Sequence, residues 1–117
     1  MSHIPPNLLE CSTIWSEVYR ALIARYNYTI RGQFFGHTHN DQFVVYTHSI
    51  TKEPTSILLE APSLSPIMSH QPAFRVYEVN RKSLRVTNYL QYSANLVEAN
   101  KHKDNDVPWQ LSYNFTN

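Results

Sequence analysis

The chain has 117 residues, of which 42% are hydrophobic and 13% aromatic, with 10 Lys and Arg against 9 Asp and Glu. These values are typical of one globular domain and argue against intrinsic disorder. The formal net charge of +1 excludes the broad basic surface that a nucleic-acid partner requires, and no apolar run reaches the roughly 18 residues of a membrane span. Six histidines would make the molecule cationic below about pH 6.

The first predicted element is an amphipathic helix over Thr13–Tyr26, with Ser12 or Thr13 as its N-cap. Apolar residues recur there at the i, i+4 and i+8 spacing of one helical face. They are Ile14, Trp15, Val18, Tyr19, Leu22, Ile23 and Tyr26. We expect this helix to cover one face of a sheet.

Two predicted strands follow the helix. Gln33–Phe35 lies between the chain's two glycines and is predicted as a short buried strand, and Gln42–His48 is rich in β-branched and aromatic residues. We expect these two strands to pair as a hairpin, with its hinge at residues 36–39.

The second half of the chain is predicted to be a β-meander. Strands are expected at Ser56–Glu60, Ala73–Val79 and Ser83–Asn88, because proline-containing segments separate these runs. The hydrophobic period is ambiguous from Tyr89 to Asn100, and residues 100–106 are typical of a polar loop. All five strands are expected to form most of one sheet.

The run Gly36-His37-Thr38-His39, directly after a buried strand, is the strongest indication of chemistry. Two imidazoles two residues apart point to opposite faces of a regular strand, so they converge only if the backbone turns, which Gly36 permits. Neutral imidazole suits zinc, and Asp41 could orient a ligating histidine or simply form a turn. The alternative is that His37 and His39 are two surface histidines in a loop.

The remaining histidines give weaker indications of a functional site. His3 precedes Pro5 and Pro6, which stiffen the chain and could aim its side chain, although a histidine near a terminus is more often exposed and mobile. The default for three others is a solvated surface position. They are His48, His70 and His102.

The single Cys11 has no partner for an intramolecular disulfide, so it is a buried thiol, a reactive thiol, or half of a bridge whose partner is missing. The triplets starting at Asn27 and Asn114 fit the N-glycosylation pattern, which also arises by chance. These triplets favour a secreted protein, although Met1–Pro6 show no signal-peptide pattern.

Taken in chain order, these motifs resemble the acid sphingomyelinase branch of the calcineurin-like metallophosphoesterases. The resemblance covers nearly the whole chain and is most specific in GQFFGHTH at residues 32–39. The other matching segments are HIPP at 3–6, APS at 61–63, FRVYEV at 74–79, NLVEAN at 95–100 and WQLSY at 109–113. It implies an α/β fold in which residues 1–117 form the C-terminal half of a two-sheet metallophosphoesterase sandwich flanked by helices.

The resemblance also implies a secreted or lysosomal phosphodiesterase that holds two zinc ions and converts sphingomyelin, or a related phosphodiester lipid, to ceramide and phosphocholine. By position in the family's motifs, His3 and His37 share one zinc and His39 binds the other. Two metals would clamp the phosphodiester and activate a water nucleophile. Cys11 falls where the family has a cysteine paired with one upstream.

The family's other zinc ligands and its general acid lie upstream of HIPP, where this chain has only Met1 and Ser2, and its helical C-terminal extension is also absent. We therefore expect incomplete zinc sites and an inactive fragment of a phosphodiesterase. The alternatives are a short, non-catalytic secreted binding protein derived from the family, or an enzyme completed by a second chain. A half-domain would expose sheet edges and apolar surface, so the isolated chain should aggregate.

Overall fold

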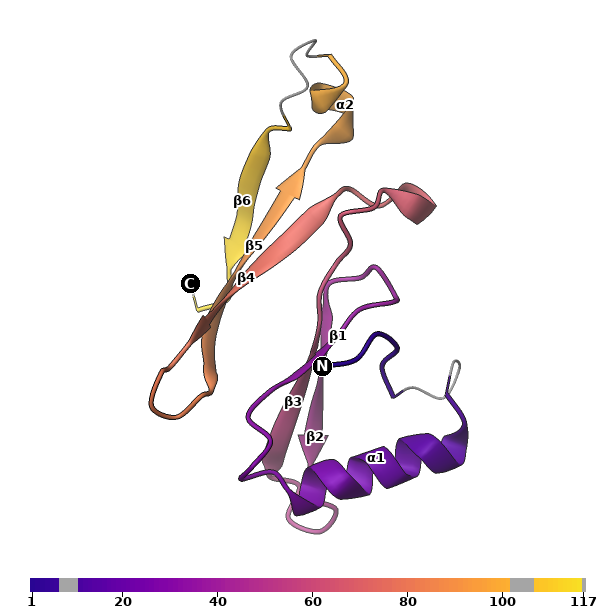
Figure 1. The fold of residues 1–117 in the computed structure, drawn as a ribbon, viewed down its shortest axis with the longest axis vertical. Coiled ribbons are helices and arrows are strands. Elements are labelled where there is room, and N and C mark those ends of the chain that lie inside the picture. The colour runs from indigo at the N-terminus through magenta and orange to yellow at the C-terminus, as the bar shows by residue number, and fades with distance from the viewer. Residues whose placement is uncertain (7–10, 102–106, 117) are drawn as a thin grey trace. The chain divides into compact units, whose positions relative to one another are not determined.

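The computed structural model describes residues 1–6, 11–101 and 107–116, which divide into two compact units (Figure 1). The N-terminal unit is Met1–Ala61 and the C-terminal unit is Pro62–Asn117. Each unit contains one three-stranded sheet, so the expected α/β class is confirmed, but the expectation of one five-stranded sheet is wrong. His102 and the rest of the predicted polar loop through residue 106 lie outside the described residues. Within the described ranges, no helix is long and apolar enough to cross a membrane.

The predicted helix is confirmed as α1 (Thr13–Arg25), which ends one residue earlier than expected, with Tyr26 as its C-cap. Ser12 is the N-cap, and its Oγ accepts a hydrogen bond from the Trp15 backbone N at 3.2 Å. This bond satisfies one of the backbone N–H groups that the first helical turn leaves without a partner.

The face by which α1 packs differs from the expected one. Ser16 is fully buried and Ile23 is 4% exposed, and both lie on the side of α1 that faces β3 (Pro54–Glu60). Most of the predicted apolar stripe is instead more than a third exposed, namely Ile14, Trp15, Val18, Leu22 and Tyr26. The packed face of the helix therefore includes the small polar Ser16 and is not its most apolar face.

The predicted hairpin between residues 33–35 and 42–48 is wrong. β3 lies between β1 (Gln33–Phe35), with which it pairs in parallel, and β2 (Gln42–Thr47), with which it pairs antiparallel. The chain leaves the sheet after β1 and re-enters on the far side of β3, so residues 36–41 cross the end of that strand. Leu58 and Leu59 of β3, 1% and 3% exposed, form the core of this sheet.

The C-terminal unit is an antiparallel meander of β4 (Ala73–Val79), β5 (Val86–Ala94) and β6 (Trp109–Asn114), in the order β4-β5-β6. The predicted strand at Ser83–Asn88 begins only at Val86, because the Asn80 side chain accepts from two backbone N–H groups and forms a turn before it. The stretch Tyr89–Asn100, whose hydrophobic period is ambiguous, contains the rest of β5 and the short α2 (Leu96–Ala99). A 3₁₀ turn, η1, spans Ile67–Ser69. The strand β6 was not predicted from the sequence.

Candidate metal centre

The N-terminal segment carries His3 to the end of β1. Ser2 N donates to Phe34 O at 3.1 Å, and Gly36 N donates to His3 O at 3.0 Å. These two bonds align the segment with the outer edge of β1, in the same direction. His3 therefore lies where the strand ends and the loop at residues 36–41 begins.

His3 and His37 face each other across this junction. His3 Nε2 lies 3.2 Å from His37 Nδ1, and the two rings meet edge to face with centroids 5.0 Å apart. Two nitrogens bound to one tetrahedral zinc at 2.0–2.1 Å would be separated by about 3.3 Å. The 3.2 Å separation fits both a hydrogen bond between the two rings and two ligands of one zinc ion.

The turn that brings these rings together is made by the histidines. His37 has φ 73° and His39 has φ 59°, whereas neither Gly32 nor Gly36 has a positive φ. The conformational freedom of Gly36, which was expected to permit the turn, is therefore not what makes it, and a Cβ there would be in ordinary contact with His3 Nδ1 at 3.8 Å. A left-handed conformation costs a residue with a Cβ on the order of 1–3 kcal/mol, so contacts elsewhere must hold this loop.

Those contacts come from Thr38 and a buried carboxylate. Glu60, the last residue of β3, is 2% exposed. Its Oε2 accepts from Thr38 Oγ1 at 2.9 Å and from Gln42 Nε2 at 2.6 Å. Sequence reasoning missed Glu60, and the available signal was a carboxylate closing the apolar run Ile57-Leu58-Leu59.

His39 has a polar atom that no described residue satisfies. Its Nδ1 is buried and accepts or donates no hydrogen bond within the described part of the chain. A buried imidazole nitrogen without a partner is unfavourable, and His70 Nδ1 is in the same state. Imidazole nitrogen is a ligand type that suits zinc. However, no three His, Cys, Asp or Glu side chains converge as a metal site among residues 1–6, 11–101 and 107–116. The described residues therefore supply only part of a metal site.

The other predicted site residues lie at separate places. Asp41 is exposed directly before β2, and its role in orienting a histidine stays a prediction. Cys11 is a half-buried thiol whose Sγ donates to Pro5 O at 3.3 Å, and its bridge to an upstream cysteine also stays a prediction. His48 is exposed, and its Nδ1 accepts from the backbone N of Ile50 and Thr51 in the turn after β2.

Both predicted glycosylation residues lie at or just after the end of an element. Asn27 is half-buried after α1, and Asn114 is half-buried at the end of β6. Asn114 Oδ1 accepts from both the backbone N and the Oγ1 of Thr116, each at 3.2 Å. This contact links the two residues that the glycosylation triplet requires, and the modification itself stays a prediction.

A part-buried series of side-chain hydrogen bonds connects α1 to the sheet. Tyr19 Oη donates to Gln33 Oε1 at 2.9 Å, and Gln33 Nε2 donates to Ser56 Oγ at 2.6 Å. Burial, with a smaller contribution from Tyr46, raises the pKa of Tyr19 to about 12. Burial also raises the pKa of Tyr46, although the guanidinium of Arg20 opposes this rise. These hydrogen bonds fix α1 against β1, the strand that leads to His37.

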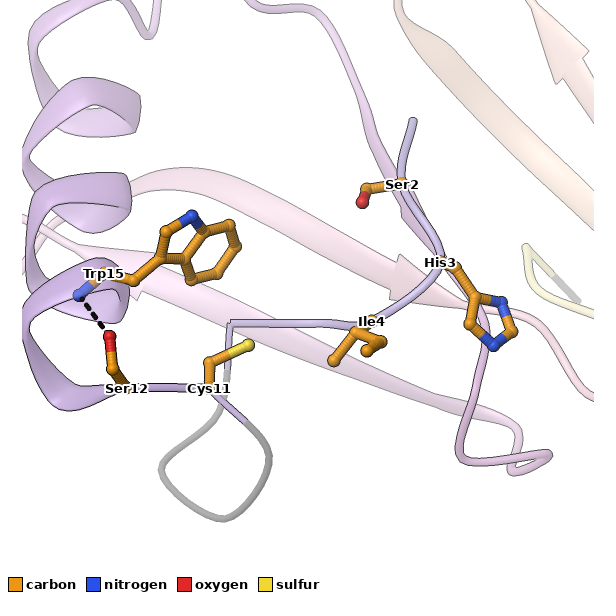
Figure 2. Close-up of a pocket in the computed structure, with 6 residues that line it drawn as sticks. All are labelled: Ser2, His3, Ile4, Cys11, Ser12 and Trp15. Atoms are coloured by element: carbon orange, nitrogen blue, oxygen red, sulfur yellow. Dashed lines mark hydrogen bonds between the residues drawn. The ribbon is translucent and has the colours of Figure 1, made fainter.

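A pocket of about 510 Å³ lies beside His3, between the N-terminal segment and the start of α1 (Figure 2). Its lining mixes small polar and apolar side chains: Ser2, His3, Ile4, Cys11, Ser12 and Trp15. In Figure 2, His3 and Trp15 lie on opposite sides of this pocket.

Comparison with known proteins identifies the family. Residues 54–117, more than half of the chain, match the acid sphingomyelin phosphodiesterase C-terminal region. Sphingomyelin phosphodiesterase A of Dictyostelium discoideum is 36% identical over 118 residues, 97% of this chain and 19% of the relative. Human sphingomyelin phosphodiesterase is 36% identical over 119 residues, 97% of this chain and 18% of the relative.

Bovine cyclic GMP-AMP phosphodiesterase SMPDL3A is 32% identical over 101 residues, which are 81% of this chain and 22% of the relative. The chain thus spans about a fifth of the length of these relatives. The matches confirm the resemblance expected from the HIPP and GHTH motifs. This chain belongs to the acid sphingomyelin phosphodiesterase C-terminal region family.

Proposed function

We propose that this chain supplies part of the zinc site of a phosphodiesterase that cleaves sphingomyelin or a related phosphodiester lipid. The observation that carries the proposal is the 3.2 Å approach of His3 Nε2 and His37 Nδ1. It occurs in a chain whose relatives are named sphingomyelin phosphodiesterases.

In this proposal, neutral His3 and His37 hold one zinc, and His39 holds a second. Bound zinc supplies polarisation of the phosphodiester oxygens and activation of water. The role of the chain itself is to orient the imidazoles. The pocket beside His3 offers room for a part of the substrate next to the histidine pair.

The 117 residues alone should bind zinc weakly and should not hydrolyse substrate. A stable zinc site takes three or four protein ligands, and the described residues bring only two imidazole nitrogens together. The missing ligands and general acid would come from a further part of the parent protein, which we propose to be secreted or lysosomal and glycosylated at Asn27 and Asn114.

A segment exchange tests this function. Residues 1–117 replace the matching segment of Dictyostelium sphingomyelin phosphodiesterase A, and hydrolysis of sphingomyelin is assayed, with cyclic GMP-AMP as a second substrate. We expect zinc-dependent turnover of sphingomyelin that His37→Ala abolishes and the control His48→Ala retains. Turnover that survives His37→Ala, or turnover by the isolated 117 residues, would contradict the proposal.

The alternative is a non-catalytic binding protein of the same family. The observation that favours it is the lack of a third converging ligand among the described residues. The segment exchange also separates the two functions, because a folded exchange protein that retains zinc but hydrolyses neither substrate would support the alternative.

A further inference from the structure

We infer that Thr38 and Glu60 are a positioning pair that holds the GHTH loop in the shape that brings His37 to His3. This inference rests on the proposed function for its metal-binding consequence. Its structural part concerns only the loop, and it can be tested without metal.

The loop needs such a pair because two of its residues have left-handed backbones. His37 and His39, on either side of Thr38, have φ values of 73° and 59°. Conformations of this kind persist only where surrounding contacts favour them over the extended alternatives. Thr38 is therefore the residue at which one contact can restrain both histidines.

The contacts of Thr38 meet this requirement. Its backbone N donates to Gly36 O at 2.9 Å, and its Oγ1 accepts from Asn40 N at 3.3 Å. Its hydroxyl donates to Glu60 Oε2 at 2.9 Å. Because Glu60 ends the central strand of the sheet, this last bond ties the loop to that strand.

The burial of Glu60 supports a positioning role. A carboxylate at 2% exposure is costly unless hydrogen bonds compensate it, and an apolar residue at the end of β3 would avoid that cost. Glu60 accepts hydrogen bonds from Thr38, within the crossing from β1 to β2, and from Gln42, where the crossing ends. Glu60 thus stabilises the crossing and the histidine arrangement within it.

The test compares Thr38→Val, which removes the hydroxyl at constant shape, with Thr38→Ser, which keeps it, in the 117-residue chain. Without metal, Cα chemical shifts of His37 and His39 report their backbone conformation. We expect Thr38→Val to move both shifts away from left-handed values and Thr38→Ser to restore them. In zinc titrations, we expect affinity to fall by about tenfold or more in Thr38→Val and to recover in Thr38→Ser.

A double variant with Glu60→Leu, which removes the acceptor, completes the experiment. If the two residues act through their mutual bond, Thr38→Val should cost less zinc affinity in the Glu60→Leu background than in the wild type. Unchanged Cα shifts in Thr38→Val, or fully additive losses in the double variant, would overturn the inference. If the wild type binds no zinc, the proposed function fails, and the chemical shifts alone decide the role of the pair.

Discussion

Three buried polar side chains, Ser16, Gln33 and Glu60, occupy positions where apolar residues are the rule. Each is 2% exposed or less. Gln33 bonds Tyr19 and Ser56, and Glu60 bonds Thr38 and Gln42. Buried polar groups that find partners specify one arrangement more strictly than apolar packing does. They fix both the rotation of α1 and the path of the histidine loop.

Tyr19 makes stability depend on pH in the alkaline range. Its pKa is raised to about 12 in the folded chain, from 10.0, so the unfolded chain loses this proton first. The free energy of unfolding should therefore fall as pH rises from about 10 to about 12. Tyr19→Phe should flatten this fall relative to the wild type in denaturant unfolding at each pH, whereas an equal slope in both proteins would contradict it.

Single residues were only partly predictable. The family resemblance of the HIPP and GHTH motifs predicted that His3 and His37 share a metal, and the structure brings these two rings together. The metal roles of His3, His37 and His39 stay predictions. Glu60 was not foreseen, since a carboxylate becomes a loop anchor only when β3 lies between β1 and β2. The positive φ values of His37 and His39 were also missed, because glycine is the usual residue for that conformation.

The helix and strands show where pattern reasoning succeeds and fails. The start of α1 and the position of β4 were predicted because capping, periodicity and prolines act locally. The strand order was not, because β1 and β3 pair across more than twenty residues of chain. The packed face of α1 was also missed, since Ser16, Tyr19 and Ile23 meet the sheet through size and hydrogen bonding rather than through greatest hydrophobicity.

The cap of α1 is open to a direct test. Ser12→Ala removes the oxygen that accepts from Trp15 N and should lower the free energy of unfolding by about 1 kcal/mol. Ser12→Asp restores an acceptor and should recover most of the loss. Thermal unfolding followed by circular dichroism measures both, and equal stability of Ser12→Ala and wild type would contradict the role of the cap.

The central position of β3 predicts a large cost at Leu58. This side chain is 1% exposed, so Leu58→Ala should lower the free energy of unfolding by about 2–5 kcal/mol. The matched control is Leu64→Ala, because Leu64 is 62% exposed. This substitution should change the free energy of unfolding little. Denaturant unfolding compares them, and similar losses at the two positions would show that Leu58 is not in a packed core.

Several large apolar side chains on edge strands are exposed in the described part of the chain. On β2, at one edge of its sheet, Phe43, Val44 and Val45 are 52%, 43% and 46% exposed, and Leu111 on β6 is 51% exposed. Exposed apolar strands at a sheet edge promote pairing with other chains. These surfaces agree with a chain that spans about a fifth of its relatives' length.

We therefore expect the purified 117 residues to self-associate at micromolar concentration in sedimentation velocity. Val45→Lys should reduce association, because a charge on an edge strand discourages pairing. Ile50→Lys, in the turn after β2, is the control and should have a smaller effect. A monodisperse monomer at the same concentration would contradict this expectation.

The claim that His3 and His37 share one metal is tested most directly by calorimetric zinc titration of the 117-residue chain. The 3.2 Å separation of their nitrogens predicts one weak site that His3→Ala and His37→Ala each abolish, while His48→Ala leaves it unchanged. A tight site that persists in His3→Ala would contradict the shared metal, and with it the proposed zinc centre.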